Sequence, residues 1–154
     1  EDSDPAEWGK VIDINVKGVY YGLRAVAPHM LAKGAGTVVN ISSGAAVSVL
    51  EGWSHYCSSK AAALMLTRAG DKEYASSGIR VLGLSPGTVA TDMQKEIKAS
   101  GVNPVSELEW EDHIPPEWVA KALAWLATED AREFDGGDVS LRDENIRKRA
   151  GITE

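Results

Sequence analysis

Cysteine is nearly absent from this sequence, since Cys57 is the single one among 154 residues. One cysteine cannot form a disulfide within the chain, and such scarcity is typical of a reducing compartment, so we expect a cytoplasmic protein. Histidine is scarce as well, and its three residues are scattered. Neither the histidines nor Cys57 have the spacing of metal ligands, so no metal site is predicted.

Long apolar runs are missing too. The sequence has no stretch of 18 or more consecutive apolar residues, so it predicts no membrane-spanning helix. The acidic residues 1–5 lack the features of a signal peptide. The net charge of −7 argues against binding to nucleic acid or to an anionic membrane. What is present is a hydrophobic fraction of 44%, enough for a core, in a length that suits one domain.

The most informative stretch is Tyr56-Cys57-Ser58-Ser59-Lys60. On a helix, residues four apart lie on one face, so the phenol and the ammonium would point into the same space. A free tyrosine titrates near pH ~10, and a nearby cation lowers that pKa by favouring the phenolate. The pair is therefore a candidate general acid/base. The alternative is a solvated lysine beside a half-buried tyrosine, because this spacing also arises by chance.

The first predicted helix spans residues 4–33. Asp4 is a candidate N-cap, and Pro5 suits the first turn. Gly34 and Gly36 end the helix. The interior holds three poor helix formers, which predict either a bend or close backbone packing: Gly18, Gly22 and Pro28.

The rest of the chain alternates between predicted strands and helices. Residues 37–41 form a short β-branched run after glycines, typical of a buried parallel strand. Ser42 and Ser43 follow at its carboxyl end, where open α/β sheets place ligands, although Ser-Ser-Gly is also common turn sequence. The later predicted elements are a helix at 56–75, a strand at 79–84, helices at 91–100 and 116–128, a short strand at 136–141 and a charged helical tail at 143–150.

Four motifs occur in order along the chain: Asn15 in Val-Ile-Asp-Ile-Asn-Val-Lys-Gly, Ser43 after Val-Val-Asn-Ile-Ser, Tyr56 with Lys60, and Pro-Gly-x-Val-x-Thr at 86–91. Together they resemble the catalytic half of the short-chain dehydrogenase/reductase family. The resemblance covers residues 5 to about 128, and residues 131–154 match only loosely. It implies an α/β fold with a partial Rossmann-like doubly wound parallel sheet, of which the C-terminal half alone is present.

The resemblance also implies an oxidoreductase that interconverts a small-molecule alcohol and a carbonyl with NAD or NADP. Tyr56 would be the general acid/base on the substrate oxygen, and Ser43 would hydrogen-bond that oxygen. Lys60 would lower the Tyr56 pKa and bind the nicotinamide ribose. Asn15 would lie at a local helix distortion and hold a water that links Lys60 to solvent.

Two further segments gain a role by the same resemblance. The loop at 86–91 would contact the nicotinamide through Pro86, Gly87, Val89 and Thr91. The irregular, acidic residues 101–115 would form a mobile substrate lid. In the family, the helices that match residues 5–33 and 55–77 pair across a two-fold axis, so a homodimer or homotetramer is expected.

Part of the family pattern is missing. No G-x-x-x-G-x-G run, the turn that cradles a pyrophosphate, occurs in the sequence, and the first four strands of the family's sheet have no counterpart. The strand at 37–42 would then be an open, apolar edge. We expect a fragment of a longer protein, a second chain that supplies the rest, or a half kept for another use. The alternative function is a non-catalytic dimerisation module without a cofactor.

Overall fold

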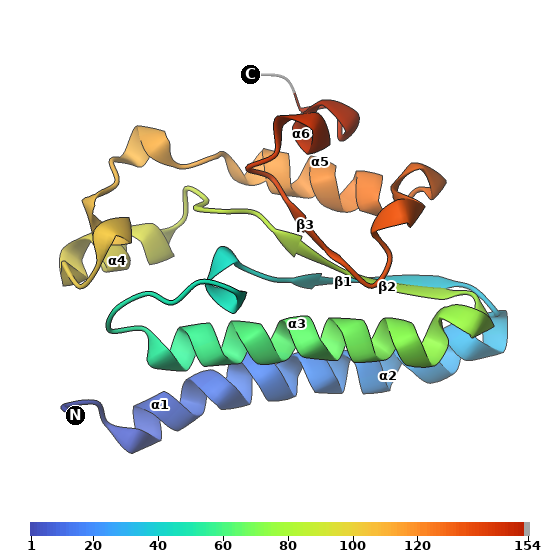
Figure 1. The fold of residues 1–154 in the computed structure, drawn as a ribbon, viewed down its shortest axis with the longest axis horizontal. Coiled ribbons are helices and arrows are strands. Elements are labelled where there is room, and N and C mark those ends of the chain that lie inside the picture. Colours follow the sequence, from blue (N-terminus) through green and yellow to red (C-terminus); the bar gives the residue numbers. More distant parts are fainter. Residues whose placement is uncertain (153–154) are drawn as a thin grey trace.

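A computed structural model describes residues 1–152, in which helices cover both faces of a three-stranded sheet (Figure 1). The strands are β1 (Gly36–Ile41), β2 (Ile79–Ser85) and β3 (Asp138–Ser140), ordered β1-β2-β3 and all parallel. The sheet confirms the predicted α/β class with a parallel sheet.

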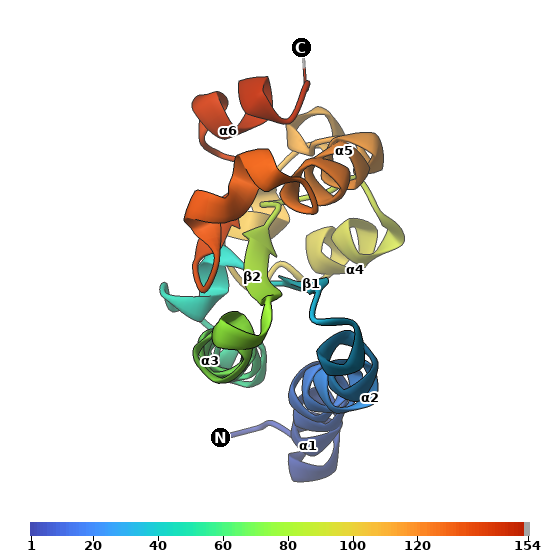
Figure 2. The same ribbon diagram turned by 90° about the vertical axis from the view of Figure 1, so that its right-hand side faces the viewer.

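The alternation of side chains along β2 separates two cores. Leu82 and Leu84 face one side, where they pack with Leu126 of α5 (Pro116–Leu126). Val81 faces the other side, where it packs with Leu23 of the long N-terminal helix. This second face carries α2 (Gly18–Lys33) and α3 (Ser54–Tyr74), which Figure 2 shows below the strands while α5 lies above them.

The N-terminal helix is continuous but changes its geometry. It runs as α1 (Pro5–Ile12), a π-helical turn η1 (Asp13–Lys17) and then α2, which ends at Gly34 with a φ of 65°. Asp4 Oδ1 accepts a hydrogen bond from the Ala6 N–H at 2.8 Å, so the predicted N-cap is confirmed.

The distortion lies before the poor helix formers rather than at them. The predicted close backbone packing at Gly18 and Gly22 is wrong within this chain. A Cβ at either position would meet no atom within 4 Å, because that part of α2 faces open space.

The remaining elements match the predicted order. α3 begins two residues earlier than predicted and is followed by a 3₁₀ turn, η3 (Ala75–Ser77). The other helices are α4 (Asp92–Ser100), α5 and α6 (Glu144–Arg149). The predicted lid region contains the 3₁₀ turns η4 (Pro104–Glu107) and η5 (Trp110–Asp112), and η6 (Glu129–Phe134) precedes β3.

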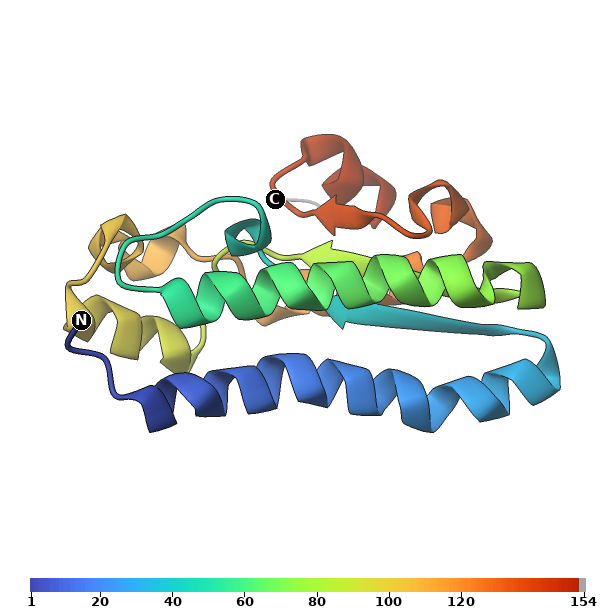
Figure 3. The same cartoon turned by 60° about the horizontal axis from the view of Figure 1, so that its bottom comes forward.

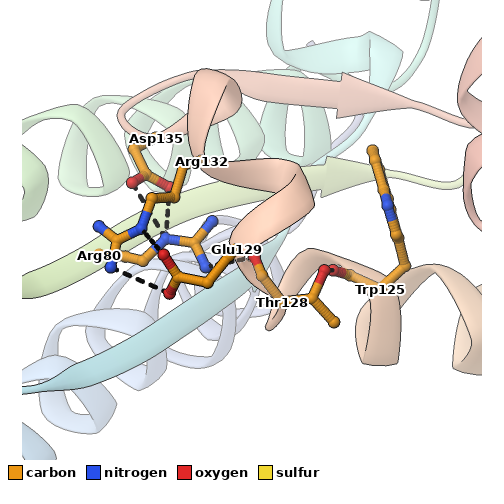
Figure 4. A network of polar contacts seen from close by, with 6 residues as sticks. All are labelled: Arg80, Trp125, Thr128, Glu129, Arg132 and Asp135. Atoms are coloured by element: carbon orange, nitrogen blue, oxygen red, sulfur yellow. Dashed lines mark hydrogen bonds and ion pairs between the residues drawn. The ribbon is translucent and has the colours of Figure 1, made fainter.

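A buried arginine ties the end of α5 and η6 to β2 (Figure 4). Arg80 is 5% exposed, and its Nε donates to the two carboxylate oxygens of Asp135 at 2.8 and 3.0 Å. Its Nη1 donates to the Thr128 carbonyl at 2.9 Å. Since Asp135 lies just before β3, this contact helps to fix where β3 joins the sheet.

Within residues 1–152, none of the helices combines the length and apolarity needed to cross a bilayer.

Candidate active site

The residues that follow β1 and β2 meet at one edge of the sheet, because the strands are parallel. Ser42 and Ser43 follow β1, and Pro86 follows β2. The Ser42 N–H donates to the Leu84 carbonyl at 2.8 Å, which holds the first turn after β1 against β2. Open α/β sheets bind their ligands at this kind of edge.

Tyr56 and Lys60 lie on one face of α3, as their spacing predicts. The Lys60 Nζ is 5.7 Å from the centroid of the Tyr56 ring. It donates a hydrogen bond to the carbonyl of Ile41, the last residue of β1, at 2.9 Å. Burial lowers the pKa of Lys60, and the carboxylate of Asp138 opposes that shift. The Trp53 ring packs edge-on against Tyr56, with centroids 5.5 Å apart.

Asn15 lies in the π-helical turn, so the distortion that the resemblance implied is present. Its Nδ2 donates to Ser59 Oγ at 3.0 Å, and Ser59 Oγ donates to the Tyr56 carbonyl at 2.8 Å. Ser59 is fully buried. The π turn therefore contacts α3 one residue before Lys60, through a serine that the sequence analysis did not single out. Its only signal in the sequence is a position three residues after Tyr56.

A groove of about 560 Å³ runs between α2 and the free edge of β1. Asn15 and Lys60 lie at its polar end. The remaining lining is mostly apolar and includes Ile14, Val26 and Ile41, which are 71%, 36% and 42% exposed. The predicted open, apolar edge of the sheet is therefore present in this chain.

Ser43 has a structural contact of its own. Its backbone is extended, and its Oγ accepts a hydrogen bond from the Ala45 N–H at 3.2 Å, which caps the 3₁₀ turn η2 (Gly44–Ala46). This contact fits the turn-serine alternative. It uses a lone pair of the hydroxyl, so the O–H proton can still be donated to another group.

The loop after β2 is tied to the predicted lid. Gly87 has a φ of 83°, a conformation that favours glycine. The Ala90 N–H donates to the Ile114 carbonyl at 2.9 Å, and the Ile114 N–H donates to the Thr88 carbonyl at 3.0 Å. Thr91 Oγ1 donates to the Val89 carbonyl at 3.3 Å, directly before α4. Pro86, Gly87, Val89 and Thr91 thus belong to one loop at the carboxyl edge of the sheet.

No group of three or more His, Cys, Asp or Glu residues in the part of the chain that the structure describes is arranged to hold a metal ion.

The sequence profile of the family described as short chain dehydrogenase matches residues 1–101. The chain belongs to the short chain dehydrogenase family. Among curated relatives, it is 38% identical over 136 residues to 2-(R)-hydroxypropyl-CoM dehydrogenase of Xanthobacter autotrophicus, which covers 84% of this chain and 53% of that protein. It is 39% identical over 140 residues to 3beta-hydroxysteroid dehydrogenase 1 of Eggerthella lenta, covering 84% and 51%. The chain spans about half the length of the curated relatives it matches.

Solved structures show the same fold. Levodione reductase superposes with a TM-score of 0.80 at 27% identity, covering 91% of this chain and 58% of that one. ElxO with NADP bound superposes with a TM-score of 0.76 at 28% identity, also covering 91% and 58%. The predicted Rossmann-like fold is therefore confirmed by known structures.

Proposed function

We propose that this chain is the catalytic, C-terminal half of an NAD(P)-dependent oxidoreductase that interconverts an alcohol and a carbonyl by hydride transfer. The observation that carries the proposal is the Tyr56–Lys60 pair on α3, with the ammonium 5.7 Å from the phenol ring and bonded to the end of β1. The relatives are named dehydrogenases, and one similar structure holds NADP. Because the chain covers about half of its curated relatives, the activity is proposed for the complete protein.

The residues present fit the nicotinamide end of such a cofactor. Lys60 lies at the polar end of the open groove, where its ammonium can donate to ribose hydroxyls. The loop formed by Pro86, Gly87, Val89 and Thr91 presents backbone groups at the same edge of the sheet and would contact the nicotinamide. NAD or NADP, when bound, supplies the hydride chemistry.

In the proposed mechanism, Tyr56 exchanges a proton with the substrate oxygen. It takes the hydroxyl proton when the alcohol is oxidised and returns it to the carbonyl oxygen in the reduction. The positive charge of Lys60, 5.7 Å from the centroid of the phenol ring, would stabilise the negative charge that develops on the phenol oxygen as its proton leaves. Lys60 needs to stay protonated for this, although burial disfavours its charge.

Ser43 and Asn15 assist the proton transfer in this proposal. The Ser43 hydroxyl accepts from the Ala45 N–H and can donate its own proton to the substrate oxygen, where negative charge develops. Asn15 uses its amide N–H on Ser59, so its carbonyl oxygen can accept a hydrogen bond from a water. That water would connect Lys60 to solvent along the groove that both residues line.

A homodimer or homotetramer is also proposed, with α2 and α3 in the contact. These helices run side by side (Figure 3) and expose Tyr20, Tyr21 and Met65, which are 48%, 59% and 60% accessible. The same exposed side chains favour the second candidate function, a dimerisation module that binds no cofactor. The two candidates differ in whether Tyr56 and Lys60 have chemistry to perform.

The test is alcohol oxidation by the complete protein, followed through the absorbance of the reduced nicotinamide, with Tyr56→Phe compared to the unsubstituted enzyme. Loss of the proton-transfer group should lower kcat by about 10²–10⁴-fold. Tyr74→Phe is the matched control, because Tyr74 lies at the end of the same helix, where it is partly buried against the core. If Tyr56→Phe kept full activity, the assigned role of Tyr56 would be wrong.

A further inference from the structure

The loop that leads into α3 is fastened to a distant segment of the chain. Residues 47–53 connect η2 to α3, and Trp53 at their end packs edge-on against Tyr56. Asn103, which lies 52 residues beyond Glu51, donates a hydrogen bond from its Nδ2 to the Glu51 carbonyl at 3.2 Å. Figure 3 shows this loop (teal) beside the segment that follows α4 (gold).

Both ends of the Asn103 amide are engaged. Its Oδ1 accepts a hydrogen bond from the Val105 N–H at 3.1 Å, which caps η4, while its Nδ2 donates to Glu51. A backbone N–H only donates and a carbonyl only accepts, so these two partners fix which way round the amide lies. Asn103 is 7% exposed. An aspartate at this position could therefore make the first bond but not the second.

An apolar contact lies beside this hydrogen bond. Gly52 has a φ of 72°, a conformation that favours glycine. A Cβ at Gly52 would overlap with Cγ1 of Val102. Val102 therefore fills the space that a side chain at residue 52 would need, and the two segments approach each other closely at this point.

The predicted lid region, residues 101–115, is held on another side by α4. Lys98 Nζ donates to the Leu108 carbonyl at 3.0 Å and to Glu109 Oε2 at 2.8 Å. These bonds join the region to the helix that directly precedes it. Asn103, by contrast, joins it to the loop that leads into α3.

The loop at 47–53 has few other ties. Within the described part of the chain its other hydrogen bonds are local, such as the one from the Trp53 N–H to the Leu50 carbonyl at 3.2 Å. Val49 is 92% exposed. Segments with few buried contacts open locally at a low cost in free energy. Loss of the Asn103 bond should therefore change how often this loop opens.

We propose that Asn103 is a positioning residue for the loop at 47–53: its amide N–H holds that loop against residues 101–115, and the loop in turn holds Trp53 against Tyr56. The consequence for catalysis rests on the proposed function, since only then does Tyr56 have a proton to transfer. The contact between Asn103 and the loop itself needs neither substrate nor cofactor.

The test is hydrogen exchange of the Trp53 amide in this chain, followed by NMR. Asn103→Asp keeps the acceptor that caps η4 but removes the donor to Glu51, so exchange at Trp53 should become about fivefold faster. Ser106→Ala is the matched control, because the Ser106 hydroxyl donates to the Asn103 carbonyl at 2.6 Å within η4, and its loss should leave Trp53 unchanged.

An unchanged Trp53 exchange rate in Asn103→Asp would overturn the proposal. Equal acceleration by Asn103→Asp and Ser106→Ala would overturn it as well, because that is the result expected if Asn103 served only to cap η4.

A second variant covers the case in which Asn103→Asp does not fold. Val102→Ser changes a side chain that is 45% exposed and removes the methyl group that packs on Gly52, so it should also speed exchange at Trp53. In that case an unchanged rate in Val102→Ser would overturn the proposal. Exchange is measured without substrate, so a failure of this contact is distinguishable from a failure of the proposed oxidoreductase function.

Discussion

Asn15 Nδ2 donates a hydrogen bond to Ser59 Oγ at 3.0 Å and so joins the π turn of the N-terminal helix to α3. The Ser59 hydroxyl in turn donates a hydrogen bond to the Tyr56 carbonyl at 2.8 Å. One buried hydroxyl thereby holds two residues of the proposed site, Asn15 and Tyr56. The π turn is thus the part of the N-terminal helix that Asn15 ties to α3.

We predict that Ser59→Ala destabilises the chain by about 0.5–1.5 kcal/mol, because the half-buried Asn15 amide loses its acceptor. The free energy of unfolding in urea measures the effect. Ser58→Ala is the matched control, since Ser58 is exposed on the same helix. Equal unfolding free energies for Ser59→Ala and Ser58→Ala would show that the Asn15–Ser59 bond contributes nothing to stability.

How much of this site the sequence predicts depends on whether a relationship lies within one element. The spacing of Tyr56 and Lys60 was enough to place both on one face of α3. Ser59 was missed because its partner lies 44 residues away, on another helix.

The elements themselves were easier to predict than their surroundings. Strand and helix order follows from apolar periodicity and turn residues, and no end of a predicted strand or helix differs from the structure by more than two residues. Gly18 and Gly22 show the limit of that approach. Two glycines spaced four residues apart on a helix favour close packing against another element. The sequence does not say whether such an element is present, and in this chain the face of α2 that carries Gly18 and Gly22 is open.

Lys60 should make stability depend on pH in the alkaline range. Burial places its pKa in the folded chain below the reference value of 10.5, so between the two values the unfolded chain binds more protons. The contribution of Lys60 to the free energy of unfolding therefore rises as pH increases through the folded pKa toward 10.5. The measurement is urea unfolding of the unsubstituted chain and Lys60→Met at about pH 7 and about pH 10.

The unsubstituted chain should gain stability relative to Lys60→Met at the higher pH. Comparing the two chains at each pH cancels groups that both contain. Lys72→Met controls for the loss of a positive charge, because Lys72 is exposed on the same helix. A stability difference that fell with rising pH would contradict the assigned direction of the Lys60 pKa.

Among the ion pairs of the described residues, the Arg80–Asp135 pair should be the one whose loss lowers the free energy of unfolding most. Arg80→Met leaves the Asp135 carboxylate and the Thr128 carbonyl without their donor, and removal of one partner from a buried pair costs about 3–5 kcal/mol. Asp135 is 23% exposed, so we expect a loss near 3 kcal/mol, about the lower end of that range.

The matched control is Arg132→Met, which breaks the exposed pair between Arg132 and Glu129 drawn beside Arg80 in Figure 4. An exposed pair contributes about 0–1 kcal/mol, so urea unfolding should separate the two variants clearly. Equal losses of unfolding free energy in the two variants would mean that the buried hydrogen bonds of Arg80 do not hold η6 to β2.

The last prediction concerns the cofactor. The residues proposed for it, Lys60 and the loop at 86–91, address the nicotinamide end, and the sequence lacks the glycine-rich turn for the pyrophosphate. This chain should therefore bind NADH and NADPH equally, and reduced nicotinamide mononucleotide equally well too, because the phosphate that distinguishes NADPH lies on the adenosine side.

Energy transfer from tryptophan to the nicotinamide measures the binding. Trp53, which packs on Tyr56, is the expected donor, so Trp53→Phe should remove most of the transfer. A tenfold preference, about 1.4 kcal/mol, would show that this chain reads the adenosine ribose. Absence of any transfer in the folded chain would favour the dimerisation module over a preformed nicotinamide site.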